Sequence, residues 1–197
     1  MTTGASQALR AAAAAATMLL AGAAAGADWG LEPLMHELAQ VKSARAKFFE
    51  RKYMAILNAP LESSGTLIYA APGRLEKHTL APRQESIVLD GDRLTLENKE
   101  RKQRRTFALS DHPVIWAFVE SIRSTLAGDL TTLRRFYQVS LEGNERQWRL
   151  VLKPVEPAML EVVSDIRIGG SRDQVLSMEF IEANGDRSTM TIARDVP

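Results

Sequence analysis

The spacing of apolar residues along the chain changes near residue 44. Before this point, apolar positions recur at helical spacing among Glu, Gln and Lys, which predicts an amphipathic helix over residues 28–43. After it, short segments rich in Thr, Ile, Val, Tyr and Phe are separated by Pro, Gly, Asn and Asp turn signals. These segments predict six consecutive strands near 44–57, 64–70, 74–80, 84–89, 92–97 and 103–109.

A helical pattern interrupts the strands in the middle of the chain. It begins at Pro113, ends at Gly128 and predicts a helix over 113–127 with one wide apolar face. The residues of that face are Ile115, Phe118, Val119, Ile122 and Leu126. Asp129 is placed to cap a shorter helix over 129–135. Because the wide apolar face lies between strands, we expect it to cover a sheet.

The rest of the chain returns to strand patterns. We expect strands around 137–141 and 148–152 and at 159–168, 174–182 and 187–193, with tight turns at Asp90-Gly91, Gly143-Asn144, Gly169-Gly170 and Asn184-Gly185. About eleven strands and three helices are compatible with a sandwich, a closed barrel or a curved sheet covered by helices. The covering helix favours a mainly β (α+β) fold, an incomplete antiparallel β-barrel whose helices plug or lid an apolar concave face. We expect one such domain over 28–197.

Residues 1–27 have the order of a secretory signal peptide. Arg10 precedes an Ala/Leu/Met run, and Ala25-Gly26-Ala27 stands before Asp28. The run is about 15 residues long, shorter than the roughly 20 residues that a transmembrane helix needs. We therefore expect cleavage before Asp28 and a soluble periplasmic protein.

Composition and motifs exclude several classes of function. The 25 Lys and Arg residues nearly balance 24 Asp and Glu, which argues against general nucleic-acid binding. The chain has no Cys, and His36, His78 and His112 do not have the spacing of a metal site. No nucleophile-elbow or phosphate-loop motif occurs. We expect no catalysis, no cofactor and no metal.

Two features leave alternatives open at this point. The basic run 99–105 is either a solvated hairpin end that deters sheet-to-sheet aggregation or a contact for a membrane or partner. Trp116 and Trp148 are either core residues or part of the lining of a lipid site.

An ordered series of short segments resembles the LolA-type outer-membrane lipoprotein carriers. The resemblance covers most of residues 31–192. The segments that carry it are Leu38–Glu50, Ser64–Tyr69, Ala71–Leu75, Glu85–Gly91, Tyr137–Val139 and Trp148–Pro154. It implies a periplasmic, monomeric carrier that binds the acyl chains of a lipid or lipidated molecule and ferries it from an inner-membrane donor towards an outer-membrane acceptor. The alternative is a non-catalytic scaffold or partner protein in envelope lipid or polyene assembly.

The chain departs from the family pattern at one turn. Lipoprotein carriers typically have a basic residue before the turn proline that helps to fasten the lid, whereas this chain has Ala71, with Arg74 as the nearest substitute. Beyond the turn, Leu75 and Lys77 stand where the carriers have aromatic residues. These differences favour a divergent LolA-related protein over the lipoprotein carrier itself.

The expected cavity wall combines alternate strand residues with the apolar helix face. Its members are Leu67, Tyr69, Leu75, Ile87, Leu89, Ile115, Phe118, Val119 and Ile122. A cation beside an apolar cavity is costly to desolvate unless it meets an anion. Arg74 and Lys77 are therefore the candidates to contact a cargo head group, unless they point outward into water.

Overall fold

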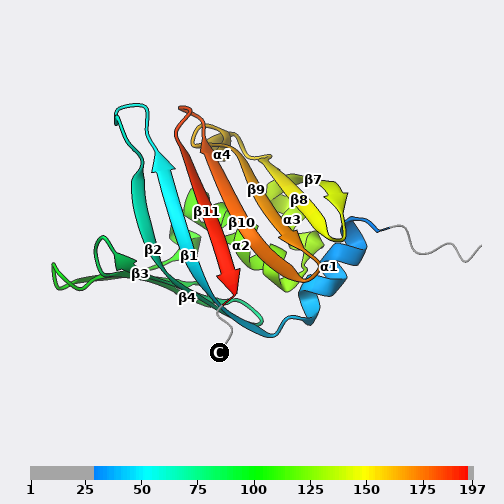
Figure 1. The fold of residues 1–197 in the computed structure, drawn as a ribbon, viewed down its shortest axis with the longest axis horizontal. Coiled ribbons are helices and arrows are strands. Elements are labelled where there is room, and N and C mark those ends of the chain that lie inside the picture. Colours follow the sequence, from blue (N-terminus) through cyan, green and yellow to red (C-terminus); the bar gives the residue numbers. More distant parts are fainter. Residues whose placement is uncertain (1–28, 195–197) are drawn as a thin grey trace, which may run out of the picture.

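Eleven antiparallel strands form a single sheet in the computed structural model, which describes residues 29–194 (Figure 1). The predicted signal peptide lies outside the described residues. The strands are β1 (Ser43–Tyr53), β2 (Leu61–Ala70), β3 (Arg74–Ala81), β4 (Glu85–Asp90), β5 (Arg93–Asn98), β6 (Gln103–Ala108), β7 (Tyr137–Asn144), β8 (Gln147–Pro154), β9 (Val163–Ser171), β10 (Gln174–Glu182) and β11 (Arg187–Arg194). Their order is β6-β5-β4-β3-β2-β1-β11-β10-β9-β8-β7. The predicted six-strand meander and the incomplete barrel are both confirmed, since β6 and β7 end the sheet without pairing with each other.

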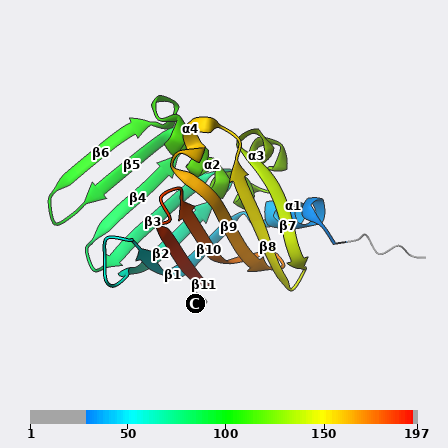
Figure 2. The same ribbon diagram turned by 90° about the horizontal axis from the view of Figure 1, so that it is seen from above.

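The helices lie on one side of this curved sheet. They are α1 (Leu31–Gln40), the 3₁₀ turn η1 (Leu109–Asp111), α2 (Pro113–Ala127), α3 (Leu130–Phe136) and α4 (Pro157–Leu160). Figure 2 shows the sheet bending so that β3 to β6 and β8 to β10 flank α2. Within the described residues, no helix is both long enough and apolar enough to span a membrane.

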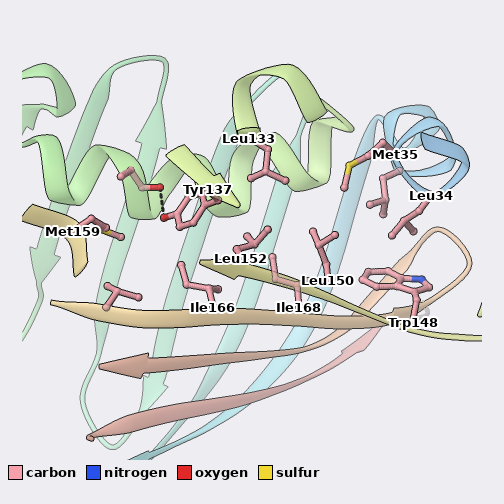
Figure 3. Close-up of a cluster of buried hydrophobic side chains, with 13 residues drawn as sticks. Leu34, Met35, Leu133, Tyr137, Trp148, Leu150, Leu152, Met159, Ile166 and Ile168 are labelled. Atoms are coloured by element: carbon pink, nitrogen blue, oxygen red, sulfur yellow. Dashed lines mark hydrogen bonds between the residues drawn. The ribbon is translucent and has the colours of Figure 1, made fainter. Parts of the chain in front are cut away.

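The main core lies between the helices and strands β7 to β9 (Figure 3). Leu34 and Met35 come from α1, Leu133 from α3, and Trp148 and Leu150 from β8. The hydroxyl of Tyr137 donates a hydrogen bond to the Ala117 carbonyl at 2.8 Å, which joins β7 to α2. Burial raises the pKa of Tyr137 well above its ordinary value, so this hydroxyl stays protonated and remains a donor.

Several predicted boundaries were wrong. The first helix is shorter than 28–43, and the first strand ends at Tyr53 instead of residue 57. Beyond Tyr53, the Ala55 amide donates to the Asp186 side chain and not to a neighbouring strand. A strand was predicted over 159–168, but residues 159 and 160 belong to helix α4, which begins at Pro157. Strand β9 begins only at Val163.

Gly169-Gly170 is not a turn, contrary to the sequence prediction. Both glycines lie inside β9, and the chain turns after Ser171, where Arg172 has a positive φ of 51°. A Cβ atom on Gly170 would lie 2.3 Å from the Trp148 ring and 2.1 Å from the Gln174 carbonyl oxygen. The glycine is thus required by close packing against the indole and the next strand.

Candidate functional site

The strand registers place the predicted wall residues on one face of the sheet. Leu67 pairs with Lys77, which pairs with Ile87, and in the next row Tyr69 pairs with Leu75, which pairs with Leu89. Residues that are directly opposite in an antiparallel ladder project from the same face. These side chains therefore share the concave face, the face that α2 covers.

A cavity of about 340 Å³ lies between this face and α2, which is within the range of roughly 300–1,000 Å³ for small-molecule sites. Its lining is mainly apolar and comes from both halves of the sheet. The apolar residues that line it from β10 and β11 are Val175, Leu176, Met178, Met190 and Ile192. The two halves and the helix together can shield a hydrophobic ligand from water.

Most of the expected wall residues line this cavity. They are Leu67, Tyr69, Leu75, Ile87 and Leu89 from the sheet, and Phe118, Val119 and Ile122 from α2. Ile115 does not line it and instead packs against a small cluster that includes Leu94 and Leu109. Trp116 and Trp148 are not among the lining residues: Trp148 is in the main core, and Trp116 packs against that small cluster.

Helices cover only one end of the concave face. Leu89 and Leu94 are opposite each other in β4 and β5 and are 2% and 6% exposed. The next concave pair, Ile87 and Leu96, is 40% and 36% exposed. Leu109 of η1 packs on the covered pair. The cavity wall therefore continues to solvent on the side of Ile87 and Leu96.

A partly buried ion pair lies on the concave face. The Lys77 ammonium is 2.5 Å from Oε2 of Glu50 and 4.9 Å from the centre of the Phe48 ring. Ser63 and Ser188 also donate hydrogen bonds to the Glu50 carboxylate. Both Lys77 and Glu50 line the cavity. The other charged residues of its mainly apolar lining are Arg45, Glu76, Asp173 and Arg194.

Arg74 lies outside the cavity. Its guanidinium donates to Glu76 at 2.9 Å and to Asp90 at 2.6 Å, and both partners belong to neighbouring positions of the sheet. Since Arg74 and Leu75 are consecutive in β3, they project from opposite faces. Arg74 therefore makes no contact that would fasten α2.

Sequence reasoning missed the residue that connects α2 to the sheet turns. Arg123 donates to the Gly91 carbonyl at 2.9 Å and forms a close ion pair with Glu120, whose side chain is buried. A Cβ atom on Gly73 would lie 2.6 Å from the Arg123 side chain. The cation at this junction thus comes from the helix and not from the turn beside Ala71. The only signal was the i, i+3 spacing of Glu120 and Arg123, which is common on helices.

Replacing Glu50 by Gln is expected to change how stability depends on pH. Burial acts to raise the pKa of Glu50, but the Lys77 charge and hydrogen bonds from Lys77, Ser188 and Ser63 outweigh it and lower the pKa. A carboxyl with a lowered folded-state pKa stabilises the protein above its unfolded-state pKa, and this contribution is lost as the pH falls through the folded-state value. Wild type should therefore exceed Glu50→Gln in free energy of unfolding most at neutral pH, with the difference shrinking below about pH 4.5.

Urea unfolding at neutral and acidic pH measures this difference. A Glu50→Gln effect of equal size at every pH would contradict the role assigned to the Glu50 charge.

The described residues show no group of three or more His, Asp or Glu side chains that could hold a metal ion. His78 is paired with Glu76 at 2.7 Å, and His36 and His112 lie on α1 and at the start of α2.

The fold and cavity define a class of protein: an open antiparallel β-sheet that encloses an apolar cavity beneath a helix. The chain belongs to the outer membrane lipoprotein carrier protein LolA-like family, whose family model matches residues 11–195. It is 24% identical over 181 residues to an outer-membrane lipoprotein carrier protein of Methylibium petroleiphilum, covering 91% of this chain and 84% of that protein.

Solved structures with a similar chain trace were also found. A LolA superfamily protein from Nitrosomonas europaea has a TM-score of 0.41 and 11% identity, over 85% of this chain and 95% of that one. A chain from the MucA/MucB complex of Pseudomonas aeruginosa has a TM-score of 0.48 and 14% identity, over 83% of this chain and 56% of that one.

Proposed function

We propose that this protein is a periplasmic carrier that binds the acyl chains of a lipid or lipidated molecule and moves it towards the outer membrane. The observation that carries the proposal is the apolar cavity under α2 in a chain of the LolA-like family. A mainly apolar lining of this kind favours the binding of hydrocarbon.

The free energy for such binding comes from removing hydrocarbon from water. Each buried CH₂ group contributes about 0.8 kcal/mol, so about eight methylenes contribute about 6 kcal/mol before the costs of association. Phe118, Val119 and Ile122 of α2 supply one wall, and the concave strand residues supply the other. A longer chain extends towards the exposed pair Ile87 and Leu96, where the apolar wall continues.

Lys77 is the proposed contact for the polar end of the cargo. Its ammonium has three donor hydrogens, and the hydrogen bond to Glu50 uses one of them. An anionic head group can therefore accept a further hydrogen bond from Lys77 while Glu50 and the Phe48 ring keep the ammonium in place.

Lys77→Met is expected to weaken binding of a fatty acid by about 1.5–3 kcal/mol, the range for a hydrogen bond to a charged group. The methionine keeps the apolar stem, so the fatty alcohol of equal chain length should bind nearly as it does to wild type. Arg74→Met is the control, because Arg74 lies outside the cavity. Competition against a fluorescent fatty acid measures all affinities. If Lys77→Met weakens acid and alcohol equally, Lys77 has no role in head-group recognition.

The same titration tests the proposed function itself. Wild-type protein should bind the fluorescent fatty acid saturably and release it to unlabelled competitor. Absence of saturable binding to either acid or alcohol would contradict the carrier proposal.

A further inference from the structure

Six cationic side chains gather at one end of strands β3 to β6. We call this group the basic tip; it consists of Arg83, Lys99, Arg101, Lys102, Arg104 and Arg105. The Lys99 amide donates to the Gln84 carbonyl at 3.2 Å, which brings the β5–β6 turn against the β3–β4 turn. All six residues are exposed. Figure 2 shows these strands reaching away from the helices.

The charge of the basic tip is not neutralised locally. Within residues 29–194, none of its six side chains forms an ion pair. The carboxylates of the β3–β4 and β5–β6 turns and their adjoining strand ends are Glu85, Glu97 and Glu100, and Glu85 accepts a hydrogen bond from the Asn98 side chain. Six cations against three carboxylates leave the basic tip positive, although the whole chain is nearly neutral.

Exposed apolar side chains lie at the same end of the sheet. In an antiparallel meander, the β1–β2 connection, the β3–β4 turn and the β5–β6 turn lie at the same end of their strands, and the twist of the sheet points the β1–β2 connection in a different direction from the other two (Figure 1). Ile56 in the first connection is 85% exposed and Leu80 beside the second is 60% exposed. Leu57 and Leu61 are also exposed there. This end therefore combines unneutralised cations with apolar side chains that contact water.

We propose that this end of the sheet docks onto an anionic membrane surface. Clustered Lys and Arg side chains are attracted to anionic lipid head groups, and neighbouring apolar side chains gain by entering the head-group region. Cations on two adjacent turns fit a fluid lipid surface, since that surface requires no fixed register with the protein. The proposal rests on the proposed function in one respect, because the exposed end of the cavity wall, Ile87 and Leu96, lies on the same four strands.

The test is sedimentation of the exported chain with phosphatidylcholine vesicles, with and without phosphatidylglycerol. Wild type should bind only the vesicles that contain phosphatidylglycerol and should dissociate as salt is raised. The triple variant Lys99→Ser, Arg101→Ser, Lys102→Asn should bind at least about ten-fold more weakly. Asn is chosen at 102 because Lys102 has a positive φ of 51°. Ile56→Ser, which changes no charge, should also weaken binding.

The matched control is Arg146→Ser, Arg149→Ser, Arg172→Asn, which removes three exposed cations at the β7 side of the sheet and keeps Asn at the positive φ of position 172. It has the same net charge as the basic-tip variant and should bind vesicles like wild type. Equal losses in the two triple variants would overturn the proposal. The proposal would also be overturned if wild-type protein failed to bind anionic vesicles at low salt but was retained by immobilised polyglutamate. That result would indicate an acidic protein partner.

Failure of docking can be distinguished from failure of the carrier proposal. The fluorescent fatty acid titration uses no vesicles, and the basic-tip residues do not line the cavity. The basic-tip variant should therefore bind the fatty acid like wild type. Loss of vesicle binding with unchanged fatty acid binding supports the docking proposal, and unchanged binding of both vesicles and fatty acid would overturn it.

Discussion

Replacing Ala46 by Trp is expected to weaken acyl-chain binding about fifty-fold. Ala46 lines the cavity from β1, opposite Leu67 on the concave face. An indole placed there occupies space that the cargo would fill. If it excludes only about three methylenes, the lost burial is about 2.4 kcal/mol, at about 0.8 kcal/mol for each CH₂. Competition titration with the fluorescent fatty acid measures the change.

The control is Thr191→Trp on the other face of the central sheet. Thr191 pairs with Phe49 in β1, it is exposed, and it does not line the cavity. The same large side chain should leave fatty acid affinity unchanged there, and both variants should remain folded. If Ala46→Trp is folded and binds like wild type, acyl chains do not occupy this cavity.

Replacing Trp148 by Ala is expected to lower the free energy of unfolding by about 3–5 kcal/mol, the range for a buried aromatic residue. The indole is 2% exposed and packs directly over Gly170. Its ring nitrogen also donates to the Arg172 carbonyl at 2.9 Å, so the truncation leaves both a cavity and an unpaired acceptor. Urea denaturation measures the loss.

Trp148→Phe separates the two contributions of the indole. Phenylalanine keeps most of the ring volume but cannot donate the hydrogen bond, so its loss should be clearly smaller than that of Trp148→Ala. A loss below about 1 kcal/mol for Trp148→Ala would contradict the placement of this side chain in the main core, because truncation of core aromatic residues costs several-fold more.

The sequence predicts the two surfaces of the cavity because each has a short-range period. Alternation along β3 places Leu75 and Lys77 on one face, and the recurrence of Phe118, Val119 and Ile122 at helical spacing places them together on α2. The Asp90-Gly91 turn was also predicted, and Gly91 has the positive φ of 61° that such a turn needs. These features depend on neighbouring residues only.

The polar part of the site could not be predicted in the same way. Glu50 accepts hydrogen bonds from Lys77, 27 positions later, and from Ser188, 138 positions later. Only the paired registers of β1 with β2 and β11, and of β2 with β3, bring these residues together. The same holds for Gly170, whose close contact with Trp148 depends on the pairing of β8 and β9. From the sequence alone, a glycine pair that forms a turn cannot be distinguished from one that packs against an aromatic ring.

Native mass spectrometry of the protein purified gently from the periplasm tests the central claim most directly. The carrier account predicts the mass of the chain beginning near Asp28 together with an additional non-covalent mass, which dissociates as an acylated molecule. The Ala46→Trp variant, purified in parallel, should carry much less of it. Wild-type protein that is exported, folded and consistently free of any acylated ligand would contradict the account and would favour a scaffold role without lipid cargo.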